Sequence, residues 1–416
     1  MAALLLAGTG LAGPGMVRVV SADDTIIDFP DPNLKKALIA NGVDTNGDGQ
    51  ISIAEMESAT GHLDLRKSYI RDLTGLEHAI RVQSIDLSLN PVEDLAPLSH
   101  LKGLYYLTLS NTNVSDLRPL AGLKLIELDL FNTKIVDIGP LSTLDQLTVL
   151  TISFTNVSDL SPLANKKLNI LFATATNVRD ISVLSTFSTL YELHLIGNQL
   201  EDISPLSRHE GLRILKLDYN NIRDIRPLSG LKNLRDLYLS NNRISDLSPL
   251  AGLKSLEELF VDDNEIRDIS ALAGLTRLAH LGISHNDIER IDALAGLRDL
   301  IELYLGYNGK ITDFTPISNL VNMRYLSMDG LGLEDIGMLE PLTRMVELNL
   351  SDNRLRNLDA LRNMSELREL RASNNQLVDI SALSDKNLLY HLELYDNPNV
   401  DAYPVKDLPN LKYLKL

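Results

Sequence analysis

One pattern of about 22 residues recurs along almost the whole chain. Its clearest copy begins at Leu215 and reads L-x-L-x-x-N-x-I-x-D-I-x-P-L-x-x-L-x-x-L-x-x, and it returns almost unchanged from Leu237 and Leu259. Two units are one residue short, and the unit that contains Gly309-Lys310 is one residue long. Sixteen units and a final fragment therefore follow one another, with first positions at Leu63, Ile85, Leu107, Leu128, Leu150, Leu171, Leu193, Leu215, Leu237, Leu259, Leu281, Leu303, Leu326, Leu348, Leu370, Leu392 and, for the fragment, Leu414.

A fixed period near 22 residues with this spacing of leucines is typical of leucine-rich repeats. The first and third positions, such as Leu237 and Leu239, lie two residues apart and are expected to point inward from a short parallel strand. The return side, as in residues 248–256, has a leucine at every third position, which is the spacing of a 3₁₀ turn. Ser248 before Pro249 is expected to cap this turn. We predict an α/β repeat solenoid: a right-handed horseshoe of about sixteen units with a parallel concave sheet and a convex side rich in 3₁₀ turns.

The sixth position of the unit is polar although it lies next to core positions. An amide side chain there can satisfy backbone groups where the strand turns away. Threonine, which occupies the position in early units, can make fewer of these bonds, and Leu331 can make none, so we expect a local weak point in the Leu326 unit. The asparagines are Asn198, Asn220, Asn242, Asn264, Asn286, Asn308, Asn353, Asn375 and Asn397, and the threonines are Thr112, Thr133, Thr155 and Thr176.

The residues before the array predict a small helical cap over residues 23–62, with the array itself spanning 63–416. An apolar periodicity from Leu34 to Ile39, started by Asp31-Pro32 and ended by Gly42, indicates a first helix. A second helix is expected from about Ile53 to Ala59, on the first repeat. A solenoid needs such a cap over its open apolar end.

Between these helices lies a stretch that matches the twelve-residue EF-hand calcium loop. Oxygen-bearing side chains stand at the positions that bind the ion, Gly49 stands where the loop turns sharply, and Ile51 stands where the loop packs inward. We predict one structural Ca²⁺ site that staples the cap, in preference to a calcium sensor, because sensors normally pair two such loops. The predicted ligands are Asp44, Asn46, Asp48, Gln50, Ser52 and Glu55.

Residues 1–22 are apolar and end in Val20-Ser21-Ala22, which resembles a signal-peptidase site, although no basic residue precedes the apolar run. We interpret them as a secretory signal peptide whose true start is missing; a disordered N-terminal tail is the alternative. No other stretch approaches the length needed to span a bilayer. The net charge of −17 argues against nucleic-acid binding, and the absence of cysteine excludes disulfides and thiolate metal sites.

The pattern N-x-I-x-D-I-x-P-L-x-x-L-x-x-L closely resembles the internalin-type repeats of bacterial surface proteins, over residues 63–416. Phe29-Pro-Asp-Pro-Asn-Leu34 resembles the start of the helical cap that precedes such arrays. The resemblance implies a secreted or wall-attached protein that binds a partner in its curved inner face. The lack of catalytic motifs separately predicts that the chain is not an enzyme. The sequence departs from the family in having no L-P-x-T-G sorting signal and no immunoglobulin-like domain after the array.

The exposed strand positions form the concave face, which is the first surface to consider for binding. Aromatic residues gather there, together with acidic ones, and exposed aromatic patches often mark binding surfaces. Histidines also fall there, and we expect them to have a contact or structural role, not a metal-binding one. The predicted partner-binding residues are Phe131, Phe154, Phe172, Glu192, Tyr219, Tyr238, Phe260, Asp262, Tyr304, Tyr307 and Tyr325.

We therefore predict a monomeric adhesin-like protein that recognises a protein partner with a basic or mixed surface. Two alternatives remain open: a carbohydrate-binding surface protein, and an intracellular regulator that resembles the phosphatase regulators with 22-residue repeats. No catalytic, phosphate-binding or dinucleotide-binding motif is present, and an open sheet has no pocket that excludes water.

Overall fold

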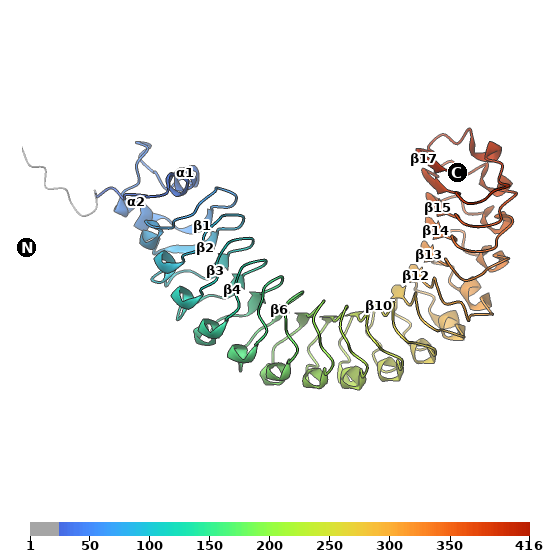
Figure 1. Cartoon of the computed structure of the whole chain (residues 1–416), viewed down its shortest axis with the longest axis horizontal. Helices are drawn as coiled ribbons and strands as arrows, with labels where there is room; N and C mark the ends of the chain where they lie inside the picture. Colours follow the sequence, from blue (N-terminus) through green and yellow to red (C-terminus); the bar gives the residue numbers. More distant parts are fainter. Residues whose placement is uncertain (1–24) are drawn as a thin grey trace, which may run out of the picture.

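The chain forms a horseshoe whose inner side is a single parallel sheet (Figure 1). This computed structural model describes residues 25–416, so the interpretation of residues 1–22 lies outside the described part. The first positions of consecutive units pair directly, as Leu237 does with Leu259, which confirms the predicted register. The strands are β1 (Gly61–Asp64), β2 (Val82–Asp86), β3 (Tyr106–Thr108), β4 (Glu127–Asp129), β5 (Val149–Thr151), β6 (Ile170–Phe172), β7 (Glu192–His194), β8 (Ile214–Lys216), β9 (Asp236–Tyr238), β10 (Glu258–Phe260), β11 (His280–Gly282), β12 (Glu302–Tyr304), β13 (Tyr325–Ser327), β14 (Glu347–Asn349), β15 (Glu369–Arg371), β16 (His391–Glu393) and β17 (Tyr413–Lys415).

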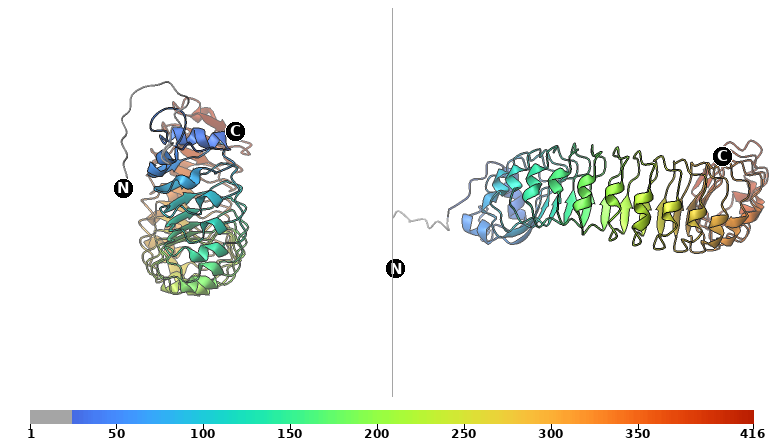
Figure 2. Two further views of the ribbon diagram at one scale, coloured as in Figure 1. Left: turned by 90° about the vertical axis from the view of Figure 1, so that its left-hand side faces the viewer. Right: turned by 90° about the horizontal axis from the view of Figure 1, so that it is seen from below.

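Short 3₁₀ turns line the outer side of the horseshoe, as predicted (Figure 2). The repeat supplies leucines at every third residue there, and these leucines are buried. The turns are η2 (Leu76–His78), η3 (Ala96–Leu98), η4 (Arg118–Leu120), η5 (Gly139–Thr143), η6 (Ser161–Leu163), η7 (Ser182–Thr186), η8 (Ser204–Leu206), η9 (Arg226–Gly230), η10 (Ser248–Leu250), η11 (Ser270–Leu272), η12 (Asp292–Gly296), η13 (Thr315–Asn319), η14 (Gly337–Leu339), η15 (Asp359–Leu361), η16 (Ser381–Leu383) and η17 (Tyr403–Val405).

The prediction that Ser248 caps its turn is wrong. Ser248 is the first residue of η10, and the preceding Leu247 makes no side-chain cap. Asp246 takes the capping role: its Oδ1 accepts a hydrogen bond from the Ser248 amide at 2.8 Å, and its Oδ2 accepts one from the Ser248 hydroxyl at 2.9 Å. The aspartate that recurs in the repeat therefore organises the start of the convex turn, because its short side chain reaches the amide two residues later.

The asparagines at the sixth position of the unit satisfy backbone groups where the strand turns away, as predicted. Asn242 donates to the carbonyls of Leu217, Leu239 and Ser240, and accepts a hydrogen bond from the Ile222 amide at 3.0 Å. Thr133, at the same position, makes one bond only, to the Leu130 carbonyl at 2.9 Å. Each asparagine thus ties two adjacent units together, whereas the threonine bonds within its own unit.

The expected weak point at Leu331 is partly repaired from the next unit. Leu331 itself is buried, and Asn353 accepts hydrogen bonds from the amides of Leu331 and Leu333 at 3.2 and 2.9 Å. The Met328 carbonyl accepts a hydrogen bond from the side-chain amide of Asn353 at 2.9 Å. A neighbouring asparagine therefore supplies part of what the leucine lacks.

The cap consists of two helices, α1 (Pro32–Ala40) and α2 (Ile53–Ser58). Asp31 begins α1 and also holds the cap to the first repeat, because its Oδ2 accepts from the backbone amides of Arg71 and Asp72. Phe29 packs over Gly75, where a methyl group would lie 2.6 Å from the ring. Within residues 25–416, the structure contains no helix with the length and apolarity required to cross a membrane.

Three polar side chains replace a core leucine of the convex side. Lys166, His209 and Lys386 occupy the position that Leu231 holds in its unit, and all three are buried. The two lysines donate to the carbonyls of Ser142 and Arg362 at 2.6 Å. The imidazole Nε2 of His209 has no hydrogen-bond partner among the described residues. At this position, therefore, the two lysines have hydrogen-bond acceptors, whereas the Nε2 atom of His209 has no partner among the described residues.

Candidate binding face and calcium loop

The predicted partner-binding residues all lie on the concave side, and none of them belongs to the interior core. Alternation along each strand leaves the residue before the first leucine, the residue after it, and the residue after the second leucine facing out. Glu192 and Tyr325 hold the first of these places, Phe172, Tyr238, Phe260 and Tyr304 the second, and Phe131 and Asp262 the third. Phe154, Tyr219 and Tyr307 follow one residue later, with exposed fractions of 51%, 62% and 41%.

Three rings form a line across β9 to β12, which we call the central aromatic row: Tyr238, Phe260 and Tyr304. The rings of Tyr238 and Phe260 stack at 5.0 Å, and Phe260 meets Tyr304 at 6.4 Å. The last two rings come from strands separated by β11, where Gly282 leaves room between them. A methyl group on Gly282 would lie 2.6 Å from the Phe260 ring. Glycine is therefore required for this contact across an intervening strand.

Three more rings, Tyr219, His285 and Tyr307, form an outer aromatic row where the chain leaves the strands. Their φ angles are 55°, 53° and 55°, in the left-handed region. Asn241 and Asp263, which tolerate this region better, hold the same place in neighbouring units. A bulky residue there costs of order 1–2 kcal/mol. The rings remain exposed, so packing in the interior does not explain why they are present.

Carboxylates lie between the two aromatic rows, and we call Asp218, Asp262 and Asp329 the acidic row. Asp218 accepts a hydrogen bond from the Ser240 amide at 3.0 Å, and Asp262 accepts one from the Ser284 amide at 2.7 Å. Burial raises the pKa of Asp218 to about 6, more strongly than these bonds and the nearby Lys216 lower it. Burial likewise raises the pKa of Asp262.

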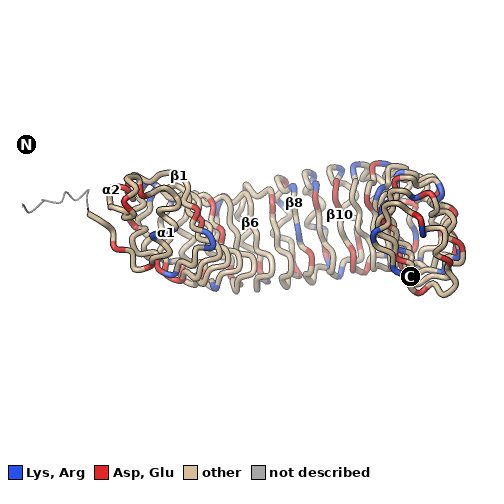
Figure 3. The backbone as a smooth tube through the Cα atoms, turned by 90° about the horizontal axis from the view of Figure 1, so that it is seen from above, with Lys and Arg blue, Asp and Glu red and all other residues tan. Residues whose placement is uncertain are grey.

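On the other side of the central aromatic row, acidic residues bind the tyrosine hydroxyls. Tyr238 donates to Glu258, and Tyr304 donates to Glu302. Glu302 also contacts Nδ1 of His280 at 2.6 Å. Figure 3 shows charged residues to be sparse around β6 and frequent from β8 onward, so the aromatic and acidic residues share the same part of the array.

A smaller aromatic group lies on the N-terminal half of the concave face. Phe131 contacts Phe154 at 5.1 Å, and Phe172 contacts His194 at 4.5 Å. Burial lowers the pKa of His194 to about 4, so this imidazole is neutral at physiological pH. No group of three His, Asp or Glu side chains within residues 25–416 is arranged to hold a metal ion in this conformation.

The loop between α1 and α2 has the backbone expected of a calcium loop. Gly47 and Gly49 adopt φ angles of 74° and 78°, and Asp44 accepts hydrogen bonds from both of their amides at 2.8 and 2.9 Å. Asn46 and Asp48 each accept from the amide two residues later. Ile51 is fully buried, and its carbonyl accepts from the Ile27 amide at 2.9 Å. The loop therefore pairs through its backbone with the residues that precede α1.

Glu55 reaches back from α2 to the start of this loop. Its Oε1 accepts from the amide and hydroxyl of Thr45 at 2.9 and 3.0 Å, and its Oε2 accepts from the amide of Ser52 at 2.9 Å. Burial raises the pKa of Glu55, but these hydrogen bonds outweigh burial and lower it to about 2. The oxygen donors fit a calcium ion in type and order, and Glu55 would exchange some of these bonds for the ion.

Comparison with known proteins agrees with this architecture. The family of leucine-rich repeats (2 copies) matches residues 124–165, 210–252, 232–274 and 276–319. An internalin (inlF) from Listeria monocytogenes is 26% identical, with a TM-score of 0.60 over 93% of this chain and 96% of that chain. The chain has the leucine-rich repeat fold and is similar to an internalin.

Two further solved structures share the fold of this leucine-rich repeat protein. The functional domain of InlJ from Listeria monocytogenes is 22% identical, with a TM-score of 0.61 over 88% of this chain and 74% of that chain. A leucine-rich repeat protein of Leptospira interrogans is 21% identical, with a TM-score of 0.61 over 90% and 98%. A search among curated protein sequences gave no significant match.

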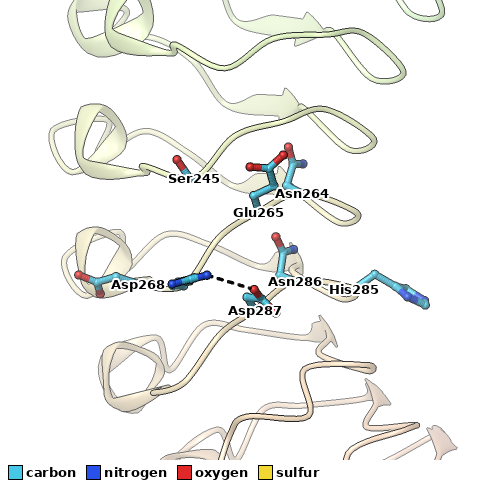
Figure 4. A pocket seen from close by; sticks show the side chains of 8 residues that line it. Ser245, Asn264, Glu265, Asp268, His285, Asn286 and Asp287 are labelled. Atoms are coloured by element: carbon cyan, nitrogen blue, oxygen red, sulfur yellow. Dashed lines mark ion pairs between the residues drawn. The ribbon is translucent and has the colours of Figure 1, made fainter.

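A surface pocket lies on the segments that leave the strands of three neighbouring units (Figure 4). Its lining includes Asn264, Arg267 and Asp287. Arg267 and Asp287 face each other in it at 3.7 Å, and Lys310 also approaches Asp287, at 3.1 Å. His285 and Asp268 point in opposite directions from it. Its one arginine is therefore already paired with Asp287.

Sequence reasoning missed two features of the concave face. It included Tyr219 and Tyr307 for their aromatic character, without recognising that they stand where the backbone is left-handed and where Asn241, in another unit, is better suited. It also passed over Gly282, which breaks an otherwise aromatic line. An alignment of the repeats by position contains both signals, because a ring replaces the usual Asn or Asp, and a glycine replaces a ring.

Proposed function

We propose that this protein is a secreted or cell-surface binding protein that recognises a protein partner through its concave face. The observation that carries the proposal is the outer aromatic row: Tyr219, His285 and Tyr307 keep exposed rings in a left-handed backbone conformation that costs stability. Two of these rings, His285 and Tyr307, stack on each other at 4.4 Å but stay exposed to solvent. Exposed residues held in unfavourable conformations are often retained for function. The similarity to an internalin supports the extracellular location.

A binding role fits the surface better than catalysis does. The concave face is open and carries large rings, the kind of residue that dominates the energy of protein interfaces. Sixteen strand spacings of ~4.8 Å give an inner arc of roughly 75 Å, which is long enough for a folded partner to lie along it.

The test is a binding screen of the purified chain against arrays of extracellular proteins and of glycans. The variant carries Tyr238→Ala, Phe260→Ala and Tyr304→Ala. The matched control carries Val136→Ala, Val321→Ala and Leu388→Ala, which remove exposed apolar side chains located outside the strands. We expect the screen to find a protein ligand that the control binds as tightly as the unaltered chain does. The concave variant should bind this ligand at least about 10-fold more weakly.

Three results would contradict the proposal: equal binding by the concave variant, loss of binding by the control alone, or ligands found only among the glycans. Circular dichroism and thermal melting of each variant establish that the fold is unchanged. The substituted side chains are outside the core, so both variants are expected to fold.

We also propose that the cap loop binds one structural Ca²⁺ ion through Asp44, Asn46, Asp48, Gln50, Ser52 and Glu55. The loop supports this proposal through its two left-handed glycines and its ordered oxygen donors. The ion would supply a charge that holds the oxygens of α2 and of the loop together. The cap would then be more firmly closed in the millimolar calcium found outside cells.

A further inference from the structure

The acidic row lies between two lines of rings, and this arrangement defines the chemistry of a ligand. Beyond the strands, backbone hydrogen bonds still join each unit to the next. The backbone amides of Tyr219, His285 and Tyr307 donate to the carbonyls of Ser240, Gly306 and Asp329, respectively. The outer aromatic row therefore runs parallel to the central aromatic row. Asp218 and Asp262 are in the line between them.

The carboxylates of this line have no cationic partner of their own. Asp218, Asp262 and Asp329 form no ion pair with any Lys or Arg in the described part of the chain, whereas Arg371 pairs with Glu369 farther along the same face at 3.0 Å. Lys216, the nearest base, instead places Nζ over the Tyr238 ring, 4.3 Å from its centroid. A cation within the protein thus already uses one ring of the central aromatic row.

We propose that the concave face between β8 and β13 docks an arginine-bearing segment of the protein partner, with its guanidinium groups over the acidic row. The proposal rests on the proposed function and names the chemistry of the partner at that face. It commits to arginine because a guanidinium stacks on rings and pairs with a carboxylate through two hydrogen bonds.

The geometry around Gly282 supports a planar group at this place. Asp262 leans into the space that a side chain on Gly282 would take, since a methyl group there would lie 2.3 Å from its Oδ2. The same methyl group would contact the Phe260 ring at 2.6 Å. An aromatic ring and a carboxylate therefore lie side by side at one point of the sheet, which is the pair of groups that a guanidinium can contact together.

The experiment uses the full chain and a fluorescently labelled nonapeptide of alternating arginine and glycine, in about 150 mM salt, where long-range attraction is screened. The matched peptide replaces arginine by neutral citrulline. Phe260→Ala removes a ring without changing charge, and Asp262→Asn removes one charge of the acidic row. Tyr69→Ala and Asp385→Asn are the controls, because they remove an exposed ring of the first repeat and the charge of an exposed aspartate outside the strands.

We expect the arginine peptide to bind, the citrulline peptide to bind at least about 10-fold more weakly, and Phe260→Ala and Asp262→Asn each to weaken binding by about 10-fold. The two controls should change binding less than about twofold. The proposal is overturned by equal weakening in Asp262→Asn and Asp385→Asn, by equal binding of the two peptides, or by absence of binding.

The outcome is separable from that of the proposed function. If the array screen finds a concave-face ligand that the arginine peptide does not displace, the function stands and the arginine proposal fails. If the concave variant binds every ligand as well as the unaltered chain, the proposed function fails, whatever the peptide does.

Discussion

Asp31 accepts a hydrogen bond from the backbone amide of Arg71 at 2.6 Å, across 40 residues of sequence. It also accepts from the amides of Asp72 and Asn33, so one carboxylate starts α1 and holds the cap to the first repeat. Asp31→Ala leaves two amides of the first repeat without this acceptor. We expect a loss of about 1–3 kcal/mol of unfolding free energy, measured by urea denaturation. The exposed Asp28→Ala is the control, and an equal loss in both variants would contradict the assigned role.

Calcium is expected to stabilise the cap. At a concentration about 100 times its dissociation constant, the ion adds about 2.7 kcal/mol to the unfolding free energy. Calorimetry with calcium and with chelator should therefore show a higher Tm in calcium for the unaltered chain and no difference for Glu55→Gln. Glu57→Gln, on the exposed side of the same helix, should respond like the unaltered chain. A Tm of the unaltered chain that ignores calcium would contradict the predicted site.

Substitutions of Asn242 should lower the unfolding free energy more, the fewer hydrogen bonds the new side chain keeps. Asn242→Leu leaves buried carbonyls and the Ile222 amide without partners, so we expect a loss of about 2–4 kcal/mol. Asn242→Thr keeps one bond, as Thr133 does, and should lose less. Equilibrium denaturation of the three proteins measures the order. A leucine variant as stable as the threonine variant would show that packing, not hydrogen bonding, decides this position.

His209 should make the array less stable in acid. Burial lowers its pKa below the ordinary 6.5, against a hydrogen bond to Leu184 that acts the other way. Below pH 6.5 the unfolded chain therefore binds a proton that the folded chain does not, and stability falls as pH drops from 6.5 toward the folded pKa.

His209→Leu places at this position the leucine that the next unit has as Leu231. It also removes the histidine that takes up a proton on unfolding. We expect the unfolding free energy of the variant to exceed that of the unaltered chain by a margin that grows from pH 7 to pH 5. Denaturation at several pH values measures the margin. A constant margin would indicate that His209 has the same pKa in the folded and the unfolded chain.

Binding of a cationic segment should depend on pH through Asp218. Its pKa of about 6 is raised first by burial and also by Asp262, and is lowered by Lys216 and the Ser240 amide. The carboxylate must be ionised to attract a cation, so binding of the arginine peptide should strengthen as pH rises from 5 to 7. Asp218→Asn should flatten this dependence. A steep dependence that survives in Asp218→Asn would assign the titration to another group.

The repeat made most of the fold predictable, because each leucine position of one unit has its partner in the next. Leu237 and Leu259 illustrate this, since their spacing in sequence alone gives their pairing. The capping of the convex turns was not predicted correctly: Asp246 and Ser248 are both common capping residues, and only the backbone shows which amide each one reaches. The calcium ligands remain predictions, because the described loop satisfies Glu55 with amides. The outer aromatic row required φ angles, which sequence does not display.

The two kinds of residue at the asparagine position have a mechanical consequence. Units joined by asparagine are linked through this side chain as well as through the sheet, whereas Thr112, Thr133 and Thr155 form side-chain hydrogen bonds only within their own unit. A solenoid flexes by small rotations summed over neighbouring units. We therefore expect the horseshoe to bend most easily among the threonine units, so that its N-terminal arm opens to admit a bulky ligand while the ring-bearing arm keeps its shape.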